Sequence, residues 1–353
     1  MKRAIKIFFI SLLCLMILTG VLVYMAFGDL VSGALSVKKI NDRFYYMEYS
    51  GDDGFDEFIE TGGAKDAGQL VEKITYFLSK GHYKPDAQPD SMKFGCAAFT
   101  VKTNGGDVLM GRNFDYNSSN TIVLHAKPKR GYQYISTFNL EFFGFGDNYM
   151  PEDFVSKYRA LSVLFVALDG INEKGFAIAD LMAGDDVETH QNTENPDLTT
   201  TAAIAYLLKN AATVNEAIEL LNKIDMHSDI GSAHHYAMSD TTGKSVVIEY
   251  VDNQMIVTPT PAVTNHYLCE KKRNVGLWET DHRYDNLCDR YESSHGIMDE
   301  NQLTESIKSV AQEPWGDNRI GGTQYTMVIN LSQKSVTYYS QRKFDEGHRF
   351  ELK

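Results

Sequence analysis

The residues with the clearest chemical potential lie in one short stretch, where Cys96 directly follows Gly95. Two charged residues come soon after, because Arg112 and Asp115 stand sixteen and nineteen positions beyond Cys96. A thiol is a strong nucleophile once a base has removed its proton. A cut between Gly95 and Cys96 would free an α-amino group with a pKa near ~8, which could act as that base. The arginine would then favour the thiolate, and the aspartate could hold the amine.

The same stretch predicts the element that positions these residues. Strand-forming residues at 99–101 and 108–110 flank Asn104-Gly105-Gly106, and Asn-Gly between such runs is a strong hairpin signal. The hairpin would place Arg112 and Asp115 across from Cys96. A buried inert cysteine beside a structural ion pair would produce the same pattern, so the hairpin alone leaves catalysis open.

The spacing from Cys96 to the run Gly111-Arg112-Asn113-Phe114-Asp115 resembles the choloylglycine hydrolase family, and the similarity continues toward the C-terminus. That family contains bile-salt hydrolases and penicillin V acylases, and it is related to acid ceramidase and the N-acylethanolamine amidases. The resemblance implies an α+β fold, the four-layer αββα sandwich of mainly antiparallel sheets found in N-terminal-nucleophile (Ntn) hydrolases. It also implies hydrolysis of a linear carbon–nitrogen amide bond by Cys96, with no metal or organic cofactor.

The resemblance supplies a further candidate near residue 180. Residues 172–182 resemble the family segment N-E-x-G-L-x-x-A-G-L-N, but here the segment ends in Asp180-Leu181-Met182. The resemblance gives the Met182 backbone N–H a place in the oxyanion hole. The family often has Asn or Tyr at this position, so the resemblance does not extend to a side-chain contact with substrate.

Two more candidates lie farther along the chain. Val263-Thr264-Asn265 resembles the family's L-T-N segment, whose Asn donates its side-chain amide to the oxyanion. Such a donor is typically worth about 10²–10³ in rate. Asp289-Arg290-Tyr291 resembles S-R-F, whose Arg lies near the nucleophile, and this makes Arg290 the candidate with Arg319 as its alternative.

The N-terminus has the composition of a membrane segment. Lys2, Arg3 and Lys6 precede an uncharged run at 7–28 that is long enough to cross a bilayer. Basic residues before such a run predict a cytoplasmic N-terminus, with the remaining chain outside the cytoplasm. An uncleaved anchor and a cleaved signal both fit, since small residues at 31–34 would suit a signal peptidase. We therefore expect an anchor or signal segment over residues 1–36.

The next segment, residues 37–95, is predicted to be a pro-segment in front of a hydrolase domain at 96–353. It contains a helical apolar face formed by residues 70–78, which ends near Gly81. Bile-salt hydrolases lack such a segment, whereas ceramidase-like relatives have longer propeptides. The segment places Cys96 inside the translated chain, so activity would require cleavage after Gly95. The catalytic part would then stay anchored only if the pro-segment remained docked.

Other patterns predict the rest of the domain. Residues 161–168 form a continuous apolar run that indicates a buried strand. The aromatic residues of 142–146 would line a pocket for an apolar acyl group or pack on the core. The remaining expected elements are strands at 121–125, 132–140, 324–329 and 335–339, helices at 197–212, 214–224 and after Asp299, and a hairpin at 245–257 turning at Asp252-Asn253.

Composition excludes some functions. The 353-residue chain is 43% hydrophobic and carries a net charge of -13, which argues against non-specific nucleic-acid binding. The cysteine and histidine spacings match no zinc site, although three histidines fall within 225–235. Pairing of Cys269 with Cys288 and formation of a homo-oligomer both stay open.

The combined interpretation is hydrolysis of a small-molecule amide, with an apolar acyl group passing through a Cys96 thioester. An acyltransferase would use the same intermediate and replace water by an amine. An unprocessed, membrane-anchored binding protein would keep the fold without catalysis. A papain-type protease would need a histidine paired with Cys96, and no flanking signature indicates one.

Overall fold

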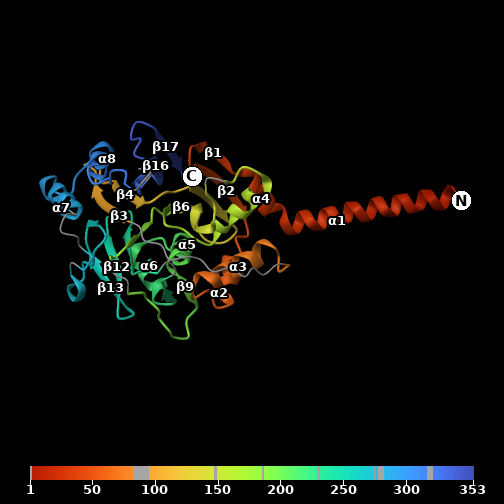
Figure 1. Cartoon of the computed structure of the whole chain (residues 1–353), viewed down its shortest axis with the longest axis horizontal. Coiled ribbons are helices and arrows are strands. Elements are labelled where there is room, and N and C mark those ends of the chain that lie inside the picture. Colours follow the sequence, from red (N-terminus) through yellow and green to blue (C-terminus); the bar gives the residue numbers. More distant parts are fainter. Residues whose placement is uncertain are drawn as a thin grey trace.

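The computed structural model describes residues 2–82, 95–146, 149–184, 187–228, 231–273, 275–276, 282–315 and 321–353, with side chains from residue 6 onward. Two packed β-sheets form the body, and helices lie around them (Figure 1). The positions of Phe94 and Arg319 lie outside the described residues. The elements below therefore concern only the described part of the chain.

The larger sheet has nine strands in the order β1-β2-β5-β6-β7-β8-β11-β12-β13. Its pairs are antiparallel except for β2 and β5, which run parallel. The predicted strands at 121–125 and 132–140 and the hairpin at 245–257 are confirmed within this sheet. The strands are β1 Lys38–Asn41, β2 Phe44–Gly51, β5 Thr121–Pro128, β6 Tyr134–Asn139, β7 Asp169–Asn172, β8 Ala177–Met182, β11 His234–Ser239, β12 Ser245–Val251 and β13 Gln254–Pro259.

The smaller sheet has six strands in the order β14-β3-β4-β15-β16-β17, and all its pairs are antiparallel. It contains the predicted hairpin, whose turn places Gly106 at φ 90°, a backbone conformation that glycine adopts readily. The closing strands predicted near the C-terminus are confirmed as well. The strands are β14 Ala262–Val263, β3 Gly95–Lys102, β4 Val108–Tyr116, β15 Gly322–Asn330, β16 Ser335–Ser340 and β17 Gly347–Glu351.

Helices cover the outer faces of the two sheets. Helix α5 (Thr200–Asn210) contacts the large sheet and α6 (Val214–Leu221), while α7 (Arg283–Ser293) and α8 (Glu300–Lys308) contact the small sheet. Asp299 accepts a hydrogen bond from the Gln302 backbone and so begins α8 with a capping box. A main core fills the space between the sheets, and a second core lies under α7 and α8. The remaining elements are η1 Leu140–Phe143, α4 Phe154–Arg159, η2 Ala160–Leu164, η3 Glu270–Lys272, and the parallel pair β9 Asp197–Thr199 with β10 Asp225–His227.

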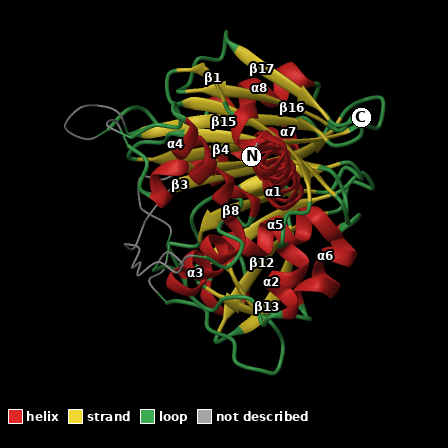
Figure 2. Cartoon of the chain, turned by 90° about the vertical axis from the view of Figure 1, so that its right-hand side faces the viewer, coloured by secondary structure: helices red, strands yellow, loops and turns green. Residues whose placement is uncertain are grey.

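The N-terminal helix α1 (Lys2–Ser36) projects from the body, as Figure 1 shows, and Figure 2 looks along it. Its apolar side chains are exposed from Ile7 to Met25. Among the described residues, α1 is a helix that is long and apolar enough to cross a membrane. Its last turns pack differently, because Leu30 and Ala34 are buried in the main core. Two short helices follow strand β2, namely α2 (Phe55–Glu60) and the predicted helix α3 (Ala67–Leu78).

One expected strand is wrong, and one of two open alternatives is supported. The apolar run at 161–168 is fully buried, but it forms the end of the 3₁₀ helix η2 and a loop instead of a strand. Its burial comes from α1, α3 and β5, which contact η2, and a short apolar run alone cannot distinguish these environments. The aromatic residues of 142–146 pack on the core, where Phe142 makes edge contacts with Tyr116 and Phe138.

Candidate active site

The hairpin of β3 and β4 presents its two faces to different surroundings. Along β3, Cys96 and Ala98 belong to the core between the sheets, whereas Ala97 and Phe99 face α7 and α8. This alternation is the two-residue period of a strand. The Cys96 side chain is therefore buried between the sheets, with no exposed surface.

Gly95, at the start of the hairpin, lies close to two neighbouring side chains. It lies opposite Asp115 in the strand register, and a Cβ at residue 95 would lie 3.2 Å from Asp115 Cβ. It would also lie 3.6 Å from Asn265 Oδ1. A Cβ at residue 95 would therefore press on Asp115 and make an ordinary contact with Asn265.

Arg112 lies on the same face of the hairpin as Cys96. It is opposite Ala98, which makes Cys96 its diagonal neighbour, within reach of a long side chain. Its Nε forms an ion pair with Asp169 Oδ2 at 2.8 Å, and its Nη2 donates to the Asp180 carbonyl at 3.1 Å. Its Nη1 has no hydrogen-bond partner among the residues that the structure describes. The predicted cation is thus fixed between the sheets beside the thiol.

The protonation state of the thiol follows from these surroundings. Burial raises the pKa of the Cys96 thiol to about 12, although the charge of Arg112 opposes this shift. The carboxylates of Asp115 and Asp180 raise the same pKa further. Cys96 in the uncut chain is therefore a neutral thiol near pH 7.

A second group of residues surrounds the backbone of Cys96. The Cys96 N–H donates to Asn265 Oδ1 at 2.7 Å. Arg283 donates to three acceptors here: the Cys96 carbonyl at 3.2 Å, Asp115 Oδ2 at 2.9 Å and Asn265 Oδ1 at 3.0 Å. Thr323 Oγ1 donates to the other Asp115 oxygen at 2.6 Å. Asn265 therefore binds the nitrogen that a cut would convert to an amine, and Arg283 links Asn265 to Asp115.

Asn265 also links the two sheets. Its Nδ2 donates to the Met182 carbonyl at 2.9 Å. Met182 ends strand β8, opposite His234 of β11. Asn265 therefore contacts both the other predicted oxyanion residue, Met182, and the Cys96 nitrogen.

Arg290 does not join this group and corrects one expectation. Its Nε donates to Asn286 of the same helix, at a solvent-exposed position. Arg283 occupies the expected place instead, seven residues earlier on α7, which corresponds to roughly 10 Å along the helix axis. The S-R-F resemblance selected the wrong turn of the helix, because seven residues return to the same helical face two turns away. The sequence analysis predicted no helix at 283–293, so Arg283 at the start of α7 was not singled out.

A further polar network was missed by sequence reasoning. His234 Nδ1 lies 3.0 Å from both oxygens of Asp180, and its Nε2 lies 3.3 Å from Ser232 Oγ. All three side chains are buried. Asp180 stands where the family segment has Gly, and that departure was the signal available in the sequence. The network lies beside the thiol because the Asp180 carbonyl also binds Arg112.

The three histidines of 225–235 each pair with a carboxylate. His227 contacts Asp197 at 2.7 Å, and His235 lies 3.5 Å from Glu249. Within the described part of the chain, no group of three or more His, Cys, Asp or Glu side chains has the arrangement of a metal site. The four cysteines are free, including Cys269 and Cys288.

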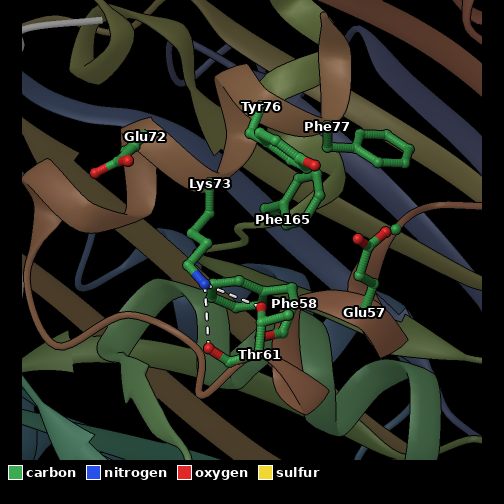
Figure 3. Close-up of a pocket in the computed structure, with 9 residues that line it drawn as sticks. Glu57, Phe58, Thr61, Glu72, Lys73, Tyr76, Phe77 and Phe165 are labelled. Carbon is green, nitrogen blue, oxygen red and sulfur yellow. Dashed lines mark hydrogen bonds between the residues drawn. The ribbon is translucent and has the colours of Figure 1, made fainter. Parts of the chain in front are cut away.

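Two cavities lie away from this group. A cavity of about 270 Å³ lies between α2 and α3, where Lys73 Nζ donates to Thr61 and the rings of Phe77 and Phe165 form a wall (Figure 3). A more open cavity of about 460 Å³ lies beside the far end of β3, around Thr100 and Lys102. Neither is lined by the residues around Cys96, so the site of the uncut chain is closed to a substrate through these cavities.

Comparison with known proteins identifies a matching family over part of the chain. The family model described as "Linear amide C-N hydrolases, choloylglycine hydrolase family" matches residues 96–266, a span that begins at Cys96. A penicillin V acylase from Pectobacterium atrosepticum is 30% identical over 100 residues, which are 25% of this chain and 26% of that protein. The match therefore spans about a quarter of that relative's length.

Solved structures of this kind share the fold. Penicillin V acylase from Agrobacterium tumefaciens has a TM-score of 0.51 at 17% identity, over 70% of this chain and 83% of that chain. A variant of conjugated bile acid hydrolase from Clostridium perfringens has a TM-score of 0.52 at 16% identity, over 72% of this chain and 92% of that chain. Residues 96–266 of this chain therefore match the choloylglycine hydrolase family of linear amide C–N hydrolases, and the solved structures of that kind share its fold.

Proposed function

We propose that this chain is a cysteine Ntn hydrolase that cleaves a linear amide bond of a small molecule through a thioester on Cys96. One observation carries the proposal: both reactive groups of Cys96 have charged or polar partners. Its backbone nitrogen donates to Asn265 beside Arg283 and Asp115, and its side chain shares the inner face with Arg112. Two sheets with helices on both outer faces support the four-layer αββα sandwich of such enzymes.

The first step is the cut that creates the base. In the uncut chain the Cys96 nitrogen is an amide, which cannot accept the thiol proton, and the pKa of the thiol is raised to about 12 by burial. Hydrolysis of the Gly95–Cys96 bond leaves a carboxylate on Gly95 and an α-amine on Cys96. The amine then accepts the Sγ proton, and Arg112 stabilises the thiolate. Asp115, held by Arg283 and Thr323, orients the amine.

Acylation follows when Sγ attacks the carbonyl carbon of the substrate. The new sulfur–carbon bond creates a tetrahedral oxyanion, which the Asn265 side-chain amide and the Met182 N–H stabilise. Asn265 Nδ2 now donates to the Met182 carbonyl, so it must turn from that acceptor to serve the oxyanion. The carbon–nitrogen bond then breaks, and the departing amine takes the proton from the Cys96 ammonium group.

Deacylation uses the same base. The Cys96 amine removes a proton from water, and the resulting hydroxide attacks the thioester carbon. The carbon–sulfur bond breaks, the carboxylic acid product leaves, and Cys96 recovers its thiol. The proposed reaction uses only groups of the protein, the substrate and water.

The proposed location is the outer side of a membrane, with α1 as the anchor. Retention of the helix is supported by its last turns, because Leu30 and Ala34 belong to the core of the domain. A Cβ on Gly33 would lie 2.8 Å from the Tyr49 ring, so this end of α1 is closely fitted to β2. The small residues at 31–34 thus have a packing role as well as the composition of a cleavage site.

The substrate proposal is a small amide with an apolar acyl group. The printed names of the relatives, penicillin V acylase and conjugated bile acid hydrolase, make penicillin V and conjugated bile acids the first probes. The aromatic residues of 142–146 do not support the apolar group, because they pack on the core.

The test starts with the intact mass and N-terminal sequence of protein purified from membranes. We expect a fragment that begins at Cys96, and this sample should hydrolyse at least one linear amide. Asn265→Ala should lower kcat by about 10²–10³, the usual effect of removing one oxyanion donor. Hydrolysis at the wild-type rate by Cys96→Ala would contradict the proposal.

A further inference from the structure

Residues 37–78 form part of the folded body instead of a separate covering segment. Strand β2 inserts beside β5 as an inner strand of the large sheet, and the parallel register runs from Phe44 opposite Thr121 to Gly51 opposite Pro128. Strand β1 then forms the edge. Removal of β1 and β2 would leave β5 as an uncovered edge, with a row of unpaired backbone groups.

The side chains of this segment, together with two from the end of α1, also complete the main core. Twelve apolar residues from before the cut position are buried there together with residues from after it. They are Leu30, Ala34, Val37, Phe44, Tyr45, Met47, Tyr49, Phe55, Phe58, Ala64, Leu70 and Ile74. Loss of the segment would expose both these residues and the apolar surface that they cover.

The segment reaches both sheets and the helices. Phe44 stacks on His348 of β17 at 5.7 Å between ring centres, and Tyr46 stacks on Phe350 at 5.1 Å. The ring of Phe165 contacts Phe55, Phe58 and Phe77. The backbone of Ala64 donates to the Asp197 carbonyl at 2.8 Å, and Asp197 donates to the Gly62 carbonyl at 3.0 Å.

One buried ion pair fixes the segment to α5. Lys209 Nζ lies 2.8 Å from both Asp53 Oδ1 and Asp56 Oδ1, and the lysine side chain is only 2% exposed. Separation of the segment from α5 would leave Lys209 and the two aspartates without the ion pairs that they form in the assembled protein. Arg130 also contacts Asp56, at 3.6 Å, but its side chain is 81% exposed.

We propose that, after a cut at Gly95–Cys96, residues 1–95 remain as a permanent subunit of the enzyme and hold the catalytic part on the membrane through α1. This inference rests on the proposed function for the cut itself. The partner that the β5 edge and the core surface accept is the N-terminal fragment of the same chain. The segment is therefore a structural subunit and not a pro-segment that is discarded.

The test separates docking from self-cleavage. Cys96→Ala in the full chain prevents the self-cut, and a specific-protease sequence inserted after His82 provides a controlled one. After protease treatment in detergent, we expect two bands on a denaturing gel and one co-eluting complex on native size exclusion. In membrane vesicles, the C-terminal piece should stay in the pellet through a high-salt wash. A folded C-terminal piece that elutes alone, or that appears in the wash, would overturn the proposal.

A pair of variants in the same background measures the docking contacts. Lys209→Ala should speed dissociation of the cut complex at least tenfold, because it leaves two carboxylates without their buried cation. Arg130→Ala is the matched control on Asp56 and should leave the dissociation rate within about twofold, as expected for an exposed pair. Equal rates for both variants, together with release of the C-terminal piece, would contradict the proposal. A wild-type chain that stays uncut would contradict the proposed function, and the protease-cut variant would still decide whether the subunit is permanent.

Discussion

Arg112 and Arg283 both approach Cys96, but they do so in different regions of the molecule. Arg112 lies between the sheets, is completely buried, and is fixed by Asp169 and the Asp180 carbonyl. Arg283 begins α7 on the other side of the hairpin and is 8% exposed. The inner arginine shares a face with the thiol, whereas the outer one binds the backbone of Cys96.

Under the proposed function, this difference separates the surroundings of the thiol from those of the future amine. The side chain of Cys96 lies on the same face as Arg112, whereas its backbone carbonyl accepts a hydrogen bond from Arg283. Arg112 acts on the charge of the sulfur in a dry environment, where a fixed charge has a large effect. Arg283 instead organises Asp115 and Asn265 around the nitrogen. Variants of the two arginines should therefore fail in different ways.

The largest effect is expected at the residue on which both regions converge. Cys96→Ala should abolish amide hydrolysis and leave the chain uncut, because it removes the sulfur that both reactions need. Cys96→Ser should slow both, since a hydroxyl is a weaker nucleophile. Mass spectrometry and an amide-hydrolysis assay measure the two outcomes. Cys288→Ala is the control and should behave like wild type, and its loss of cleavage would undermine the assignment of Cys96.

The inner region makes a prediction about pH. With the pKa of the Cys96 thiol raised to about 12, the uncut chain at pH 8 should hold roughly 10³-fold less thiolate than an ordinary cysteine with a pKa near ~9. Alkylation of Cys96 should therefore stay slow below about pH 10 and rise only as the pH approaches 12. The site of alkylation is found by peptide mass mapping of the fraction of the wild-type chain that is still uncut. Fast alkylation at pH 7 would mean that Arg112 outweighs burial.

Stability should distinguish the two arginines. Arg112→Met leaves the Asp169 carboxylate buried without its cation, so the free energy of unfolding should fall by about 3–5 kcal/mol. Arg283→Met should cost less, because Thr323 still donates to Asp115 and Arg283 lies closer to solvent. Denaturant titration in detergent compares the two variants with wild type. An equal loss for both would remove the distinction between a dry inner region and an outer one.

The smallest effects concern the choice between two arginines on one helix. Arg283→Lys should lower the rates of cleavage and hydrolysis about tenfold to a hundredfold, since lysine cannot reproduce the forked contacts to three acceptors. Arg290→Lys should change either rate by no more than about twofold, because Arg290 contacts Asn286 at an exposed position. The reverse order of effects would restore Arg290 as the site residue.

Part of this site was predictable because its geometry is local. Asn104-Gly105-Gly106 sets a tight turn, and the register of the hairpin then places residues 98 and 112 opposite each other. Cys96 and Arg112 fall on one face because a strand alternates its side chains with a period of two. The turn at Asp252-Asn253 was readable for the same reason, and both residues have positive φ, as a tight hairpin turn requires.

Other parts depended on contacts that no local pattern encodes. Arg283 lies 187 residues from the Cys96 carbonyl that it binds, and its neighbour Arg290 shares its helical face. The apolar run at 161–168 fits a buried strand or any other buried segment, and only the packing of α1 and α3 decided it. The insertion of β2 beside β5 was equally unpredictable, because the sequence of a strand does not specify which strand it pairs with.

The sequence by itself determined which residues of the hairpin share a face, and it predicted Cys96, Arg112 and Asp115 as candidate site residues. It also determined the apolar N-terminal helix, since length and composition suffice for that. The tertiary structure decided which distant groups reach Cys96 and that residues before the cut position are built into the sheet. The physical reason is that strand and turn geometry is set by neighbours along the chain, whereas pairing and burial are set by which surfaces meet in the assembled core.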